Sequence, residues 1–162
     1  MDKAKKIKIN PIEEAKKLME EYPDKIVIPD DFIAADEIKE PKEKKNVDLT
    51  KGQKLPKGWV YLDIGSKTIE KFIKIIKKSK TVFWDGPMGK YEDVRFRNGT
   101  LKIAEAIAKN GKTTILAGGD TAALAGNFGL IFKYSHVSIA GGATLQYIAD
   151  RKMPGIEALM DK

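Results

Sequence analysis

Two short stretches of this sequence share one pattern, in which an apolar strand ends in paired glycines and a helix begins at once. Residues 115–121 read ILAGGDT and residues 138–144 read SIAGGAT, and both continue into apolar residues at helical spacing. Paired glycines admit backbone conformations that other residues avoid, and they let backbone N–H groups approach a ligand closely. The positive end of the following helix dipole favours phosphate at the same place. The repeat therefore predicts two anion-binding turns on neighbouring strands, although glycines also serve simply to make tight turns.

Three polar residues close to these glycines each have two interpretations. Asp120 is either a helix cap or a Mg²⁺ ligand, because a carboxylate beside bound phosphate is a natural place for that ion. Thr121 and Thr144 either cap their helices or offer hydroxyl groups to a ligand. The near-repetition of the motif, together with Asp120, favours anion binding by the glycine turns, and both interpretations of the two threonines stay open.

A third glycine-rich segment, residues 81–92 (TVFWDGPMGKYE), also follows an apolar strand. Its Gly-Pro and Gly residues predict a rigid loop, and Glu92 lies just beyond it. An acidic residue near a phosphate site often accepts hydrogen bonds from ribose hydroxyls, but sequence spacing alone favours an exposed loop position for Glu92. Residues 86–91 are not a P-loop, because too few residues separate the glycines and no Ser or Thr follows Lys90. The G-x-G-x-x-G pattern of dinucleotide-binding folds is also absent from the sequence.

From residue 59 to the end, apolar strands alternate with amphipathic helices over short connections. This alternation predicts an α/β fold with a doubly wound parallel sheet, Rossmann-like in type. The expected strands are 59–65, 81–84, 113–117 and 136–140, with helices at 67–79, 101–110, 120–129 and 143–150. Upstream, we expect a helix at 11–22, a buried strand at 25–29, an extended stretch at 30–39 and a polar surface loop at 39–57.

Composition narrows the classes of function. The 162-residue chain has no cysteine and one histidine, which excludes disulfides, thiolate metal sites and a multi-histidine site within one chain. Its net charge of +7 comes almost wholly from lysines scattered among glutamates, so we expect no nucleic-acid partner. Residues 1–10 lack an apolar signal core, and no run is long enough to span a bilayer. We therefore expect a cytoplasmic protein without membrane contact.

Five segments together closely resemble the C-terminal part of phosphoglycerate kinase, in that family's order and spacing. They are residues 27–37 (VIPDDFIAADE), 61–72 (YLDIGSKTIEKF), 83–92 (FWDGPMGKYE), 116–130 (LAGGDTAALAGNFGL) and 135–159 (SHVSIAGGATLQYIADRKMPGIEAL). The resemblance implies a glycolytic kinase that transfers a phosphoryl group between 1,3-bisphosphoglycerate and Mg-ADP, giving 3-phosphoglycerate and ATP. It also implies two doubly wound domains closing on a hinge, the N-terminal one binding glycerate and the C-terminal one binding nucleotide.

The resemblance further implies roles for individual residues. Gly118 and Gly119 would place backbone N–H groups on the nucleotide phosphates. Gly141 and Gly142 would face the transferring phosphoryl group, which makes them, together with Gly119, the expected catalytic positions. The remaining implied contacts are Mg²⁺ with Asp120, a phosphate oxygen with Thr121, the ribose hydroxyls with Glu92 and the nucleoside with Pro87. The expected ligands are therefore ATP or ADP together with Mg²⁺.

Three positions depart from the family pattern. Asp85 stands where the family usually has Asn, and an extra carboxylate near phosphates should weaken nucleotide binding unless a metal ion or a lysine offsets it. Ala117 and Ala140 replace the first glycine of each turn, a change that is tolerable where positive φ is not needed.

The chain is also much shorter than the family's two-domain enzyme. We expect residues 1–162 to form a single, partial nucleotide-binding domain without the glycerate-binding N-terminal domain. Such a chain would carry part of the Mg-nucleotide site and be inactive alone, with 3-phosphoglycerate bound only when the missing domain is supplied. The alternative is a non-catalytic standalone or engineered half-domain that folds, self-associates through an exposed sheet edge, and binds nucleotide weakly or not at all.

Overall fold

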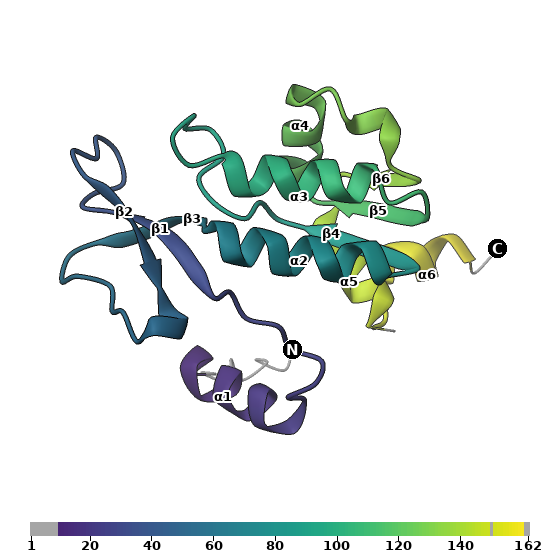
Figure 1. Ribbon diagram of the computed structural model, residues 1–162. Coiled ribbons are helices and arrows are strands. Elements are labelled where there is room, and N and C mark those ends of the chain that lie inside the picture. The colour runs from purple at the N-terminus through teal and green to yellow at the C-terminus, as the bar shows by residue number, and fades with distance from the viewer. Residues whose placement is uncertain (1–9, 150, 161–162) are drawn as a thin grey trace.

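The computed structural model describes residues 10–149 and 151–160, and it contains two three-stranded sheets connected by helices (Figure 1). One sheet is antiparallel and the other is parallel. The expectations about the signal core at residues 1–9 and about a helix reaching residue 150 lie outside the described residues. Within the described residues, no helix is both long enough and apolar enough to cross a bilayer.

The parallel sheet confirms the α/β fold class. Its strands are β4 (Thr81–Asp85), β5 (Thr113–Ala117) and β6 (His136–Ser138), in the order β4-β5-β6. Because all three strands run the same way, their carboxyl ends and the loops that follow lie along one edge. The helices of this part are α2 (Ser66–Lys78), α3 (Asn98–Ala108), α4 (Gly119–Asn127), the 3-10 turn η2 (Ile131–Lys133), α5 (Gly141–Ile148) and α6 (Pro154–Met160).

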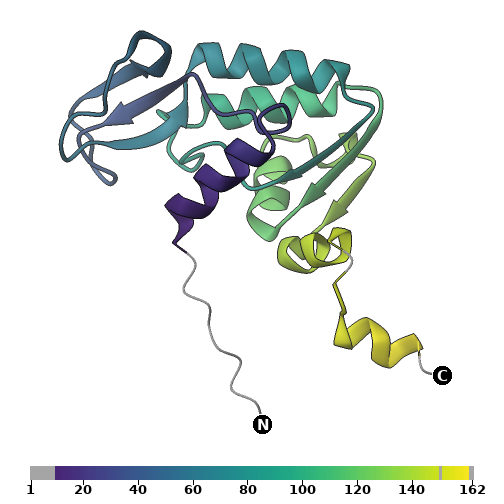
Figure 2. The same cartoon turned by 90° about the horizontal axis from the view of Figure 1, so that it is seen from below.

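Helices α2 and α3 lie side by side and cover the parallel sheet (Figure 1, Figure 2). The apolar side chains of α2 recur at helical spacing, so the helix buries one stripe and leaves most of its lysines in solvent. The buried residues of the shared core are Ile64, Ile69, Ile76, Trp84, Ile103, Ala104, Ile107, Leu116, Ala122, Leu124, Ala125 and Tyr134. This core holds the ends of β4 and β5 in fixed positions.

The antiparallel sheet differs from the sequence expectation in two ways. Its strands are β1 (Asp31–Ala35), β2 (Lys44–Asp48) and β3 (Val60–Ile64), in the order β2-β1-β3, and the 3-10 turn η1 (Leu49–Lys51) follows β2. The placement of β3 in the parallel sheet is wrong, because β3 pairs antiparallel with β1. The polar segment 39–57 lies mostly at the surface as expected, but it is not a loop throughout, because it contains β2. The sequence of β2, KKNVD, shows no apolar alternation, and only its last two residues are buried.

The N-terminal helix α1 (Pro11–Glu21) begins where the sequence predicts. The Asn10 side chain accepts a hydrogen bond from the Ile12 N–H at 3.1 Å, and proline occupies the first turn. No residue of α1 is buried.

The buried strand predicted for residues 25–29 is wrong. Ile26, Val27 and Ile28 are 37%, 43% and 49% exposed, and no strand among the described residues pairs with them. An apolar run becomes a buried strand only where a neighbouring strand supplies hydrogen-bond partners and a packed layer covers it. The described residues provide neither for this segment.

Two buried aspartates of the antiparallel sheet bind the starts of the two long helices. Asp31 on β1 accepts hydrogen bonds from the N–H and the hydroxyl of Thr68 in α2, at 2.9 and 2.8 Å. Asp63 on β3 accepts one from the Gly99 N–H in α3, at 2.8 Å. A carboxylate at a helix N-terminus is stabilised by the unpaired N–H groups and by the helix dipole. These contacts fix the antiparallel sheet against the helical layer.

Candidate functional site

The two glycine turns meet at the carboxyl edge of the parallel sheet. The Gly118 N–H donates a hydrogen bond to the Ser138 carbonyl oxygen at 3.0 Å, across the pair β5–β6. A Cβ placed on Gly141 would lie only 3.1 Å from the Gly118 Cα atom. The two turns are therefore packed directly against each other, as expected for neighbouring parallel strands.

Each turn leads into a helix whose first residues have no side-chain cap. Gly118 precedes α4 with φ of +94°, a conformation that favours glycine. Ala140 precedes α5 with φ of −105°, so the alanine in the second turn is under no strain. Neither helix start has a hydrogen bond from a capping side chain. The N-termini of α4 and α5 thus lie next to each other, with Gly119 and Gly141 as their first residues.

Asp120 and Glu92 both act electrostatically on Tyr91. Burial raises the pKa of the Tyr91 hydroxyl, and the negative charges of Glu92 and then Asp120 raise it further. Asp120 is in the first turn of α4 and is exposed, as is Glu92. Two residues that follow different strands, Glu92 after β4 and Asp120 after β5, are therefore both within electrostatic range of Tyr91.

The carboxylates present suit a cation that is held jointly with a ligand. No group of three or more His, Cys, Asp or Glu side chains within residues 10–149 and 151–160 could enclose a metal ion. Mg²⁺ is commonly bound by one or two carboxylates together with substrate phosphates and water. Asp120 has no ion-pair partner among the described residues, and its charge fits that arrangement.

The two threonines serve the turns in different ways. Thr121 is 1% exposed, and its hydroxyl accepts a hydrogen bond from the Gly86 N–H at 2.8 Å. This bond ties the loop after β4, including the exposed Pro87, to α4. The Thr144 hydroxyl donates to the Ala140 carbonyl oxygen at 2.7 Å, which matches a local structural role. A phosphate contact by Thr121 stays a prediction.

The loop that carries Pro87 and Glu92 is also anchored to the antiparallel sheet. The Lys90 N–H donates to the Leu62 carbonyl oxygen at 2.8 Å, and Gly89 lies so close to that strand that a Cβ there would overlap it. Farther along, Arg95 forms an ion pair with Asp93 at 2.7 Å and holds the pKa of that carboxyl well below its usual range. Sequence reasoning missed this ion pair, since acidic and basic residues two apart are common on exposed loops.

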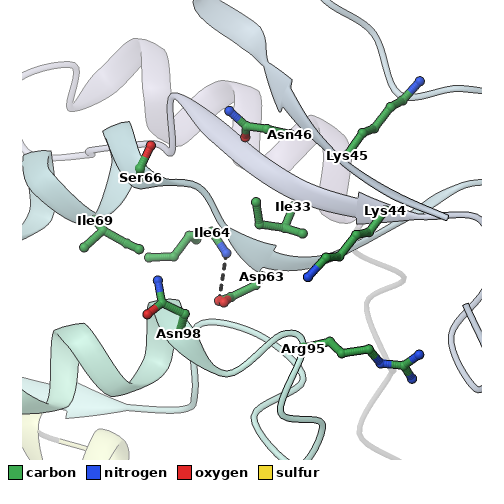
Figure 3. Close-up of a pocket in the computed structure, with 10 residues that line it drawn as sticks. All are labelled: Ile33, Lys44, Lys45, Asn46, Asp63, Ile64, Ser66, Ile69, Arg95 and Asn98. Atoms are coloured by element: carbon green, nitrogen blue, oxygen red, sulfur yellow. Dashed lines mark hydrogen bonds between the residues drawn. The ribbon is translucent and has the colours of Figure 1, made fainter.

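A cleft of about 400 Å³ lies elsewhere, between the antiparallel sheet and the starts of α2 and α3 (Figure 3). None of the predicted site residues lines it. Its buried carboxylate, Asp63, is already bonded to the Gly99 and Ile64 N–H groups, although burial still raises its pKa. In Figure 3, Lys44 reaches toward Asp63, whereas Arg95 points away. The cleft is thus separate from the glycine turns, and its carboxylate serves the fold.

Comparison with known proteins places the chain in a family. The family model for phosphoglycerate kinase matches residues 2–151. The chain belongs to the phosphoglycerate kinase family. It is 46% identical to the phosphoglycerate kinase of Pseudothermotoga lettingae over 151 residues and 44% identical to that of Thermosipho africanus over 154 residues, each match covering 91% of this chain.

Solved phosphoglycerate kinases also share the fold. The structure from Coxiella burnetii superposes with a TM-score of 0.81 and 30% identity, covering 90% of this chain and 38% of that one. The structure from Pyrococcus horikoshii superposes with a TM-score of 0.80 and 30% identity, covering 92% of this chain and 36% of that one. The chain spans 38% of the length of the two bacterial relatives named above.

Proposed function

We propose that this chain supplies part of the Mg-nucleotide site of a phosphoglycerate kinase. The reaction it serves is phosphoryl transfer between 1,3-bisphosphoglycerate and Mg-ADP, giving 3-phosphoglycerate and ATP in the cytoplasm, as a step of glycolysis. The observation that carries the proposal is the meeting of two uncapped helix starts, α4 and α5, beside Asp120. Membership of the family supports it.

The backbone of the two turns has the main role in this proposal. The N–H groups of Gly118 and Gly119 bind the nucleotide phosphates, and those of Gly141 and Gly142 face the transferring phosphoryl group. Phosphoryl transfer depends on positioning and on stabilising charge more than on covalent chemistry by the protein. Fixed N–H dipoles at two helix starts provide such stabilisation without rearranging during the reaction.

Side chains around the turns complete the proposed site. Glu92 accepts hydrogen bonds from the ribose hydroxyls, and Pro87 lines the nucleoside side. Asp120 holds Mg²⁺, which would neutralise phosphate charge, and Thr121 bonds a phosphate oxygen. In this proposal a single nucleotide contacts Glu92 through its ribose and Asp120 through its phosphates and Mg²⁺.

The site is proposed to be incomplete within this chain. Because the chain spans 38% of its relatives' length, we propose that turnover and 3-phosphoglycerate binding require the remaining part of a phosphoglycerate kinase. The chain alone is then a nucleotide-binding piece with no catalytic activity.

Calorimetric titration of the 162-residue chain with Mg-ADP tests this proposal. We expect saturable binding that is lost when EDTA removes Mg²⁺. Circular dichroism of the same sample shows whether the chain is folded. A well-folded chain that takes up no Mg-ADP would contradict the proposed role.

A second candidate is a non-catalytic module that associates with a second copy of itself. Among the described strands, β4 has a neighbour on one edge only, and apolar side chains near the chain's end are exposed, including Tyr147 at 69% and Leu159 at 81%. An unpaired strand edge and apolar surface favour association. Sedimentation equilibrium tests this candidate, which fails if the chain stays monomeric across the accessible concentrations and binds Mg-ADP.

A further inference from the structure

Asp85, the last residue of β4, lies over both glycine turns. A Cβ placed on Gly118 would lie 2.6 Å from Asp85 Oδ1. A Cβ placed on Gly141 would lie 2.9 Å from Oδ1 and 3.2 Å from Oδ2 of the same side chain. The space that the two glycines leave open is therefore filled by one carboxylate.

This carboxylate has no hydrogen-bond or ion-pair partner among the described side chains. It is exposed at the edge of the sheet, unlike the buried Asp31 and Asp63. Its position next to Gly118 and Gly141 puts its negative charge at the starts of α4 and α5, where the helix dipoles favour an anion. Asp85 thus supplies the kind of charge that a bound phosphate would supply.

A phosphate group that approaches the same N–H groups meets this charge at close range. Like charges a few ångströms apart repel each other, less strongly at an exposed carboxylate than at a buried one. A divalent cation between the phosphate and the carboxylate reverses the sign of the interaction, because both anions then face a cation. Binding of a phosphate group and binding of a cation are therefore coupled at Asp85.

We propose that Asp85 is a specificity-determining residue, an anion at the meeting point of the two glycine turns that disfavours a bare phosphate group and favours one that binds together with a divalent cation. The inference rests on the proposed function, because it assumes that these turns receive phosphates. It adds a cation preference that comes from β4, in addition to the Mg²⁺ role proposed for Asp120.

The test uses thermal unfolding with inorganic pyrophosphate as the probe, with and without Mg²⁺, so that no nucleoside contact is needed. Asp85→Asn keeps the shape of the side chain and removes its charge. Asp24→Asn, at an exposed position after α1, makes the same change in net charge elsewhere. Asp85→Ala serves as a second neutral variant should the amide destabilise the turns.

Without Mg²⁺, we expect pyrophosphate to stabilise Asp85→Asn at a concentration about tenfold lower than it does the unsubstituted chain. With saturating Mg²⁺ the difference should shrink to a few-fold, and Asp24→Asn should behave as the unsubstituted chain throughout. Equal responses of the unsubstituted chain and both Asp85 variants without Mg²⁺ would overturn the proposal. A response of Asp24→Asn as large as that of Asp85→Asn, or no response of any variant under either condition, would overturn it as well.

The Mg-ADP titration separates this inference from the proposed function. If Mg-ADP binds but pyrophosphate does not distinguish Asp85→Asn, the nucleotide role stands and the role of Asp85 is wrong. If pyrophosphate distinguishes the variants but Mg-ADP does not bind, the turns are an anion site and the nucleotide role is wrong.

Discussion

The molecule uses aspartates at helix starts in two contrasting ways. Beside the antiparallel sheet, Asp31 and Asp63 are buried and bonded to the first turns of α2 and α3. At the carboxyl edge of the parallel sheet, Asp85 and Asp120 are exposed, and no hydrogen bond to either side chain occurs among the described residues. The same residue type at the same kind of position thus stabilises the fold in one region and leaves charge available to a ligand in the other.

The largest expected loss of stability comes from removing the Asp31 carboxylate. Asp31→Ala removes the carboxylate that accepts from the Thr68 and Lys67 N–H groups at the start of α2, so we expect a loss of about 2–3 kcal/mol in the free energy of unfolding. Asp85→Ala, the matched change in the other region, should cost less than about 1 kcal/mol. Urea denaturation of both variants gives the two values. Equal losses would show that the two kinds of aspartate do not differ.

The next effect concerns the backbone of the first turn. Gly118→Ala forces a side chain into a conformation with φ of +94° and against Asp85, so we expect a loss of about 1–3 kcal/mol in unfolding free energy. Gly119→Ala is the control, because its Cβ would meet nothing closer than the Ile139 carbonyl oxygen at 3.9 Å. Thermal unfolding measures both losses of stability, and equal losses for the two substitutions would refute the expectation.

Asp120 should affect binding far more than stability. Asp120→Asn is expected to weaken Mg-ADP binding by about tenfold, close to 1.4 kcal/mol, and to change unfolding free energy by less than about 0.5 kcal/mol. Calorimetry and denaturation on the same preparation give both quantities. A fall in stability as large as the fall in affinity would make Asp120 a structural cap, like Asp31.

The smallest effect concerns acid stability in the antiparallel region. Hydrogen bonds from Lys67 and Thr50 lower the pKa of Asp48 to about 2, below its ordinary value of 3.8. A lowered pKa in the folded state stabilises the fold above the unfolded-state value, and that contribution disappears as pH falls through the folded one. Lys67→Met should therefore flatten the loss of stability between about pH 4 and pH 2.

The effect should be modest, because Lys67 is about half exposed and solvent screens its charge. Lys74→Met, on the exposed side of α2, is the matched control and should leave the acid limb unchanged. Urea midpoints at several pH values supply the measurement. An acid limb as steep in Lys67→Met as in the unsubstituted chain would refute the assignment to Asp48.

The parallel half of the fold could be predicted because each of its signals is local. Strands β4, β5 and β6 are apolar runs bounded by glycine or polar turns, and the pairs they form lie within the chain. Strand β2 could not be predicted, since its exposed residues carry no apolar alternation and its position depends on pairing with β1. The strand predicted at 25–29 was wrong for the opposite reason, because the apolar pattern is present but no strand in the described part of the chain pairs with it.

The candidate site shows a similar division. The adjacency of the two glycine turns follows from the rule that parallel strands end along one edge of a sheet, so it could be predicted from the sequence. The position of Asp85 over both turns was beyond sequence spacing, because it depends on the order of strands in the sheet. The sequence marked Asp85 as unusual but could not show that its carboxylate fills the gap between Gly118 and Gly141.

The cap that Asp31 provides also has a consequence for the order of folding. The start of α2 depends on a side chain 37 residues upstream, so its first turn is completed only once β1 has docked. Helix formation here waits for a long-range contact and for the loop closure which that contact requires. The antiparallel sheet and the beginning of α2 should therefore open and close as one cooperative unit, with amide protons of β1 and of the first turn of α2 exchanging at matched rates.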